Sequence, residues 1–134
     1  MKSIVDLEKG QLLEEITLSP VSRINLIKYA GASGDFNPIH TIDAEATKAQ
    51  LPGIIAHGMW TMGNLSKLFT PFLEEGFIQD YKIRFAGMVF LEDVITLKAR
   101  LQEKNNELLN FKVAAVNQNG QEVIKGEITF KKYL

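Results

Sequence analysis

The pattern of hydrophobic and polar positions changes near the middle of the chain. In the first half, apolar residues recur at helical spacing and predict helices at about 20–33, 43–50 and 57–69. The third of these is apolar nearly all round, as expected of a helix that is buried on most sides. From Gly76 onward the period falls to two, which predicts strands at 77–90, 93–104, 107–118 and 121–132, with a further short strand at 14–18.

Residues that cap helices and make turns stand at the ends of several of these elements. Ser19 is placed to cap a first helix opened by Pro20 and ending near 31–34, and Asn119-Gly120 predicts a hairpin between the last two strands. One buried helix followed by antiparallel strands predicts an α+β fold, in which a curved sheet wraps around the helix at 57–69. A single layer of this kind leaves a face or an edge exposed, so we expect a monomer not to be the working unit.

Composition and charge narrow the class of protein. A length of 134 residues predicts one domain, 1–134. The formal net charge of −1 and the lack of a basic stripe argue against a nucleic-acid partner. The chain has no cysteine, which excludes disulfides and thiolate chemistry. Residues 1–10 read as neither signal peptide nor anchor, and no apolar run is long enough to span a membrane, so we expect a cytoplasmic protein.

The most informative segment is Ser-Gly-Asp-Phe-Asn-Pro-Ile-His at 33–40. It places the carboxylate of Asp35 five residues from the imidazole of His40, on a loop stiffened by Pro38, so the two groups could hold a water between them. That favours water addition, water removal or hydrolysis. Most of these residues are also turn formers, so an ordinary helix-to-loop connection with a half-buried His40 and no catalytic role accounts equally for this sequence.

A second segment, Pro-Gly-Ile-Ile-Ala-His-Gly-Met-Trp at 52–60, places His57-Gly58 where the buried helix is expected to begin. A helix N-terminus presents unpaired N–H groups and positive partial charge, which suit a carbonyl oxygen that is becoming negative. Gly58 has no side chain, so a thioester could approach its amide closely. A glycine that permits tight packing of helix on sheet is an equal reading of the same position.

Together the two segments resemble the MaoC-like hydratases and dehydratases, which include (R)-specific enoyl-CoA hydratases and (3R)-hydroxyacyl-ACP dehydratase subunits. Tyr29, the segment 33–40 and Ala46 fit the family signature without a gap. Ala-His-Gly-Met at 56–59 lies at the family's spacing, and Tyr-Lys-Ile-Arg-Phe at 81–85 looks like the family's strand after the helix. The resemblance extends over essentially the whole chain.

The resemblance implies a hot dog fold and reversible hydration of trans-2-enoyl thioesters to (R)-3-hydroxyacyl thioesters. It assigns Asp35 and His40 as the catalytic pair that binds the reacting water, and the amide of Gly58 as the donor to the thioester oxygen. The substrate carrier, coenzyme A or acyl carrier protein (ACP), stays open, as do the acyl chain length, the pathway, the physiological direction and the identity of the base within the pair.

The family pattern also implies supporting residues. Asn37 is expected to orient the loop or the pair, Ser66 to support the site from the helix, and His57 to serve mainly as a structural residue at the helix start. Imidazole and carboxylate are zinc ligands, but no zinc motif is present and the family uses none, so we expect no metal and no cofactor.

Partners and alternative activities follow from the same resemblance. It implies a homodimer whose sheets join edge to edge, with a heterodimer open. Because one fold hosts several activities, a hot dog acyl-CoA thioesterase and a non-catalytic acyl-thioester-binding subunit remain alternatives. The chain departs from many relatives at 51–54 and at Trp60; if either lines the acyl tunnel, the large indole predicts a preference for short acyl chains.

Overall fold

The computed structural model describes residues 3–134, so the part of the single-domain prediction and of the N-terminal reading that falls on residues 1–2 lies outside the described residues. The helices are α1 (Arg23–Ser33), α2 (Asp43–Lys48) and α3 (Gly58–Leu65), with 3-10 segments at Ile4–Asp6, Pro38–His40 and Ser66–Phe72. The strands are β1 (Ile16–Thr17), β2 (Gly76–Phe85), β3 (Thr96–Lys104), β4 (Leu108–Val116) and β5 (Glu122–Lys132).

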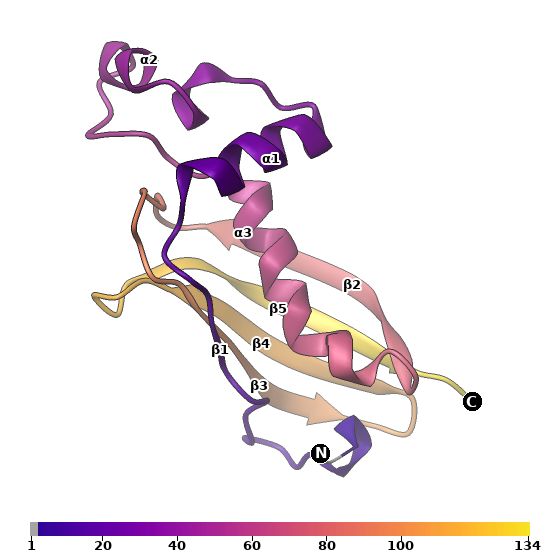
Figure 1. Cartoon of the computed structure of the whole chain (residues 1–134). Helices are drawn as coiled ribbons and strands as arrows, with labels where there is room; N and C mark the ends of the chain where they lie inside the picture. Colours follow the sequence, from indigo (N-terminus) through magenta and orange to yellow (C-terminus); the bar gives the residue numbers. More distant parts are fainter. Residues whose placement is uncertain (1–2) are drawn as a thin grey trace.

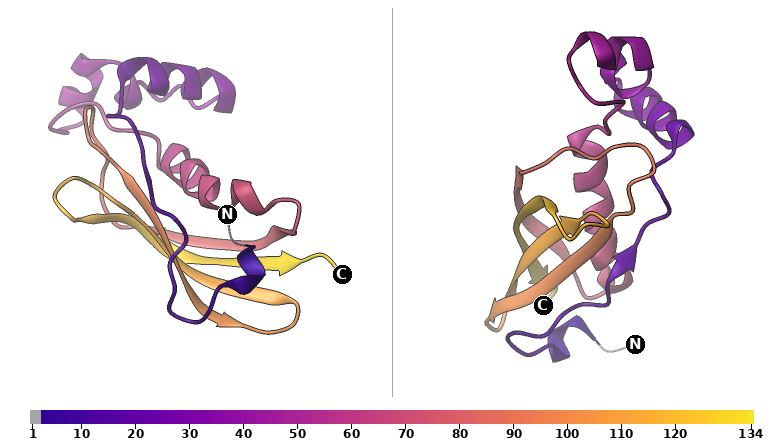
Figure 2. Two further views of the ribbon diagram at one scale, coloured as in Figure 1. Left: turned by 60° about the horizontal axis from the view of Figure 1, so that its bottom comes forward. Right: turned by 90° about the vertical axis from the view of Figure 1, so that its left-hand side faces the viewer.

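A five-stranded antiparallel sheet with the order β1-β3-β4-β5-β2 curves around α3. Figures 1 and 2 show α3 and the 3-10 segment that continues it lying across one face of this sheet, while α1 and α2 lie beyond the N-terminal end of α3. The α+β prediction of a hot dog architecture, with a sheet wrapped around a central helix, is therefore confirmed.

The core lies between the central helix and the sheet because alternate residues of the inner strands point to the helix. In β4 these are Leu109, Phe111, Val113 and Ala115, all buried. Phe69, at the end of the central helix, packs edge-on against Phe111 with ring centroids 5.1 Å apart.

A polar contact also holds the helix against the sheet. Tyr81 of β2 donates its hydroxyl to the carbonyl of Met62 in α3 at 2.5 Å, and burial raises the pKa of Tyr81. This bond satisfies a hydroxyl that would otherwise be buried without a partner, so it helps to set the position of the helix over the strands.

The first helix begins later than the capping pattern indicated. Ser22 caps it by accepting a hydrogen bond from the amide of Asn25 at 3.2 Å, so the prediction of a start at Ser19-Pro20 was wrong. The segment before Ser22 is held extended, since the amide of Leu18 donates to the carbonyl of Ile95 and that of Val21 to Asp93. The helix ends, as predicted, at Gly34, which adopts the left-handed conformation with φ of 77°.

The strand boundaries also differ from the pattern. β2 ends at Phe85, and the chain beyond it meets the 51–57 segment at an isolated bridge between Phe90 and Ile55. The predicted hairpin joins β4 to β5, with Gly120 at φ of 77° donating to the carbonyl of Asn117. Within residues 3–134, no helix has the length and apolar character needed to cross a membrane.

Candidate active site

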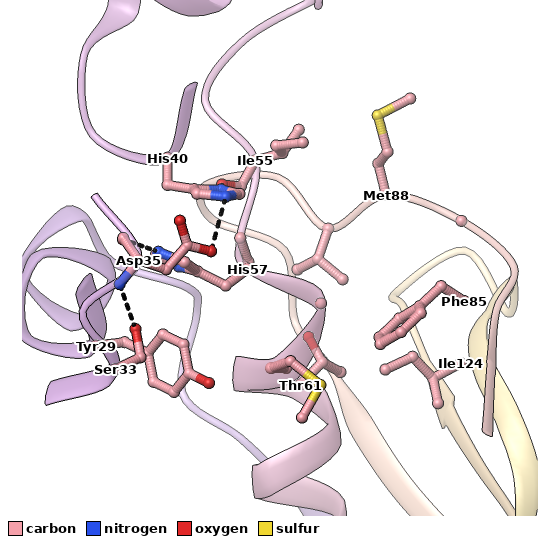
Figure 3. A pocket seen from close by; sticks show the side chains of 15 residues that line it. Tyr29, Ser33, Asp35, His40, Ile55, His57, Thr61, Phe85, Met88 and Ile124 are labelled. Atoms are coloured by element: carbon pink, nitrogen blue, oxygen red, sulfur yellow. Dashed lines mark hydrogen bonds and ion pairs between the residues drawn. The ribbon is translucent and has the colours of Figure 1, made fainter. Parts of the chain in front are cut away.

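A pocket of about 570 Å³ opens where the loop after α1, the start of α3 and the end of β2 meet (Figure 3). Both sequence motifs contribute to its wall, although they are separated along the chain. Polar, aromatic and methionine side chains line it together with Gly58: Tyr29, Ser33, Asp35, His40, His57, Met59, Thr61, Phe85 and Met88. The pocket is therefore the place where the predicted catalytic pair and the predicted oxyanion site come together.

Asp35 is held by hydrogen bonds within its own loop. Its backbone amide donates to the hydroxyl of Ser33 at 3.1 Å, and its Oδ1 accepts from the amide of Asn37 at 3.2 Å, which restricts the side chain. Turns of this kind form because short polar side chains reach backbone amides two residues away. The second carboxylate oxygen, Oδ2, is left to face the pocket and His40.

His40 has a defined tautomer because of its backbone partner. Its Nδ1 lies 2.8 Å from the carbonyl of Ile55, and a carbonyl only accepts, so Nδ1 carries the proton and donates it. In the neutral ring the other nitrogen, Nε2, is then an acceptor with a free lone pair. The side chain is about one tenth exposed, and Nε2 points to the carboxylate of Asp35.

The two groups are close but do not bond directly. Oδ2 of Asp35 and Nε2 of His40 are 3.9 Å apart, well beyond the roughly 3 Å of a hydrogen bond. One water lying beside both atoms could donate a hydrogen bond to each of them. The pair therefore has the geometry of two acceptors that share one donor, which suits the activation of water.

His57 supports both members of this pair. Its Nε2 donates to the carbonyl of Asp35 at 3.1 Å, and its ring stacks on that of His40 with centroids 3.8 Å apart. Tyr29 packs edge-on against the ring of His57, with ring centroids 4.8 Å apart. Desolvation by burial lowers the pKa of His57, with a smaller contribution from His40, so the ring is favoured in its neutral form.

His57 lies at the helix start, as expected, but its side chain contacts the loop that carries Asp35 and does not cap the helix. It occupies the N-cap position of α3, but its side chain makes no capping bond to the helix. Its Nδ1 is buried and has no hydrogen-bond partner within residues 3–134. The ring instead links the start of α3 to the loop that carries Asp35.

Gly58 is the first residue of α3, so no carbonyl of its own helix accepts from its amide. The ring of Phe85, at the end of β2, lies directly over it: a side-chain carbon added to Gly58 would fall 2.6 Å from that ring. Any larger residue would therefore crowd this wall of the pocket. The lack of a side chain thus permits the start of α3 to pack closely against the end of β2, which is the packing reading of this glycine; approach of a thioester to its amide stays a prediction.

The remaining predicted residues lie outside the pocket wall. Asn37 accepts from the amide of Ile39 at 3.3 Å and so begins the 3-10 turn that carries His40, which matches an orienting position. Ser66 donates its hydroxyl to the carbonyl of Gly63 at 2.6 Å, within its own helix, and does not reach the pocket.

Trp60 and the segment 51–54 do not line this pocket either. Trp60 borders a separate hollow with Asn64 and Lys67 on the other side of α3. The expectation of short acyl chains depended on one of these segments lining the site. It therefore receives no support from the pocket that holds Asp35.

A carboxylate and two imidazoles could also bind a metal ion. One ligand atom each from Asp35, His40 and His57 lies within 4.8 Å of the others. However, the rings of His40 and His57 are stacked at 26°, so their in-plane lone pairs run side by side and do not converge on one point. One nitrogen of each ring is also engaged by a backbone carbonyl. The arrangement favours acid–base chemistry over ion binding.

Thr61 and Phe85 are among the lining residues that the sequence reasoning did not assign to the site. Phe85 belongs to a segment that was noticed only as a strand. Thr61 lies one helical turn after Gly58, and this spacing is the one signal in the sequence that could have placed it on the same face of the helix.

Comparison with known proteins gives consistent matches. A family model described as "MaoC like domain" matches residues 8–123. The 3-hydroxybutyryl-CoA dehydratase of Methylorubrum extorquens is 29% identical over 121 residues, which are 89% of this chain and 76% of that protein. A fatty acid synthase subunit beta of Aspergillus oryzae is 36% identical over 104 residues, or 74% of this chain, and the chain spans only 5% of that protein.

A solved structure also matches closely. The R-hydratase PhaJ1 of Pseudomonas aeruginosa, in its unliganded form, superposes with a TM-score of 0.87 at 29% identity. The superposition covers 96% of this chain and 83% of that one.

Proposed function

Because the chain belongs to the MaoC-like dehydratase family, we propose that it catalyses the reversible hydration of trans-2-enoyl thioesters to (R)-3-hydroxyacyl thioesters. The observation that carries this proposal is the 3.9 Å separation of Asp35 Oδ2 and His40 Nε2 on the pocket wall. Two proton acceptors at that separation suit a shared water better than they suit a surface for holding an acyl chain. The relative named as a 3-hydroxybutyryl-CoA dehydratase supports the same reaction class.

In the hydration direction, a water donates one hydrogen bond to Asp35 and one to His40. As the water oxygen bonds to C3 of the enoyl group, the pair takes one proton, and the π electrons move through C2 to the thioester oxygen. The pair then returns a proton to C2 from the same face, so no atom is gained or lost beyond the water. Such general acid–base action contributes about 10²–10⁴-fold to a rate.

The negative charge that develops on the thioester oxygen needs a donor placed in advance. The amide of Gly58, which has no acceptor within its own helix, serves this purpose, since it lies at the positive end of the α3 dipole and borders the same pocket as the pair. His57 keeps the two parts in register, because it joins the start of α3 to the backbone of Asp35.

The partner we propose is a second copy of the chain, joined edge to edge through β2. This strand is at one edge of the sheet, and over Gly76–Phe85 it pairs with β5 on one side only within the described residues. An unpaired edge of ten residues invites another strand. Light scattering should give twice the mass of 15.0 kDa. A monomeric mass would point instead to a heterodimer with a different chain.

The proposal is tested by hydration of crotonyl-CoA, followed as the loss of enoyl-thioester absorbance, with the stereochemistry of the product determined separately. We expect turnover to the (R)-3-hydroxy product, and a fall of at least about 100-fold in both Asp35→Asn and His40→Ala. Asp43→Asn is the matched control, because this exposed carboxylate forms a surface ion pair with Arg23 and lies outside the pocket.

The same assay separates the alternatives. Release of free thiol would identify a thioesterase. Tight binding of the acyl thioester without turnover, unaffected by Asp35→Asn, would identify a binding subunit. Turnover of the ACP-linked substrate alone would assign the carrier, and turnover that survives both substitutions in the pair would refute the proposed mechanism.

A further inference from the structure

Thr61 carries a buried hydroxyl that the fold does not use. The residue is 1% exposed, and within residues 3–134 its Oγ1 has no hydrogen-bond partner. Buried hydroxyls are nearly always paired, because leaving one unpaired is destabilising. The exception therefore calls for a reason beyond packing.

A threonine in a helix ordinarily bonds to a carbonyl three or four residues back, and this helix shows that pattern elsewhere. Ser66 donates to the carbonyl of Gly63, and the side chain of Asn64 donates to that of Trp60. Thr61 makes no such bond, although the same kind of acceptor is near. Its hydroxyl is thus available to a group that is not part of the chain.

The position of Thr61 indicates what that group is. It borders the catalytic pocket and lies one turn after Gly58, whose amide begins the helix. Helical side chains lean toward the N-terminus, so Thr61 covers the turn that contains Gly58. Figure 3 shows it on the face of α3 that looks toward Phe85 and Ile124.

Phe85 closes this corner in the structure as it stands. Its ring rests against Gly58, and about half of the Phe85 side chain is exposed, at the last residue of β2. We expect a thioester carbonyl that reaches the Gly58 amide to move this exposed ring aside and, in doing so, to uncover the buried hydroxyl of Thr61.

We infer that the Thr61 hydroxyl is the second donor to the thioester oxygen, beside the amide of Gly58. This role rests on the proposed hydratase function and adds a catalytic residue to it. The hydroxyl donates its hydrogen to the oxygen as negative charge accumulates there, and it transfers no proton. Two donors stabilise an oxyanion better than one, because each acts in a pocket from which water is displaced.

The test is Thr61→Val, which replaces the hydroxyl by a methyl group of similar size. We expect kcat for crotonyl-CoA hydration to fall about 10²–10³-fold, with little change in KM and no change in the shape of the pH profile. Thr61→Ser keeps a hydroxyl and should stay within about tenfold of wild type. Thr70→Val, at an exposed position in the 3-10 segment that follows α3, is the control and should be unaffected.

Thermal unfolding distinguishes a catalytic role from a structural one. Removal of an unpaired buried hydroxyl should leave the midpoint of Thr61→Val equal to that of wild type or higher. A clearly lower midpoint, or a kcat within twofold of wild type, would overturn the assignment while leaving the hydratase function intact. If wild type turns over neither CoA-linked nor ACP-linked enoyl thioesters, the proposed function fails, and the assignment of Thr61 fails with it.

Discussion

Replacing Gly58 by alanine should separate the catalytic demand at the helix start from the demands of folding. The added methyl carbon would fall 2.6 Å from the ring of Phe85, where apolar carbons normally stay about 3.5–4.0 Å apart. The ring must therefore retreat by roughly 1 Å. Because Phe85 is 53% exposed, its ring can do so without disturbing the core.

Two opposing terms set the effect on stability. Alanine is better than glycine within a helix by up to about 1 kcal/mol, and the displaced ring loses contacts of similar size. We therefore expect the free energy of unfolding to change by less than about 1 kcal/mol. In the proposed mechanism, however, the thioester oxygen must reach the Gly58 amide past this methyl group, so kcat/KM should fall about 10²–10³-fold, or roughly 3–4 kcal/mol of barrier.

The matched control is Gly63→Ala in the same helix. A side-chain carbon at Gly63 meets no atom within 4 Å, so this change should stabilise the protein by about 0.5–1 kcal/mol and leave turnover alone. Urea unfolding and crotonyl-CoA hydration measure the two quantities on each variant. Wild-type turnover in Gly58→Ala would refute the reasoning, and so would a stability loss of about 3 kcal/mol, because the activity loss would then be structural.

Two further predictions concern residues that hold the site and the helix. Burial lowers the pKa of His57 in the folded state, so as pH falls below its ordinary value of 6.5 the unfolded state takes up the proton first and stability is lost. His57→Gln should therefore cost more stability at about pH 7.5 than at about pH 5.5, as compared by urea unfolding at the two pH values; an equal cost at both would exclude this linkage. Tyr81→Phe should cost about 1 kcal/mol by removing the bond to Met62, with turnover kept, and an unchanged unfolding midpoint would show that the bond contributes nothing net.

The local parts of this protein could be predicted because their interactions are close in sequence. Within 33–40, Ser33, Asp35 and Asn37 each accept a hydrogen bond from an amide two residues ahead, so the turn is encoded in the residues that form it. The strand pattern and the apolar character of the helix at 57–69 predicted the α+β architecture for a similar reason. Periodicity reports which side of an element faces the core.

Where local signals competed with tertiary contacts, the contacts decided. Ser19-Pro20 is a good helix start, yet Leu18 and Val21 donate to the carbonyls of Ile95 and Asp93, and this extended pairing delays α1 to Arg23. A capping propensity of about 1 kcal/mol does not outweigh backbone bonds that order two segments together.

The site shows the same division. The sequence by itself determined that an acid, an imidazole and a glycine at a helix start are present, and the turn that holds Asp35. Only the tertiary structure decided that the carbonyl of Ile55 sets the tautomer of His40, that His57 stacks beneath it, and that Trp60 faces a different hollow. These contacts join residues that are distant in the sequence, and the packing of α3 against the sheet sets how far apart they lie in space. A local sequence pattern carries no information about such distances.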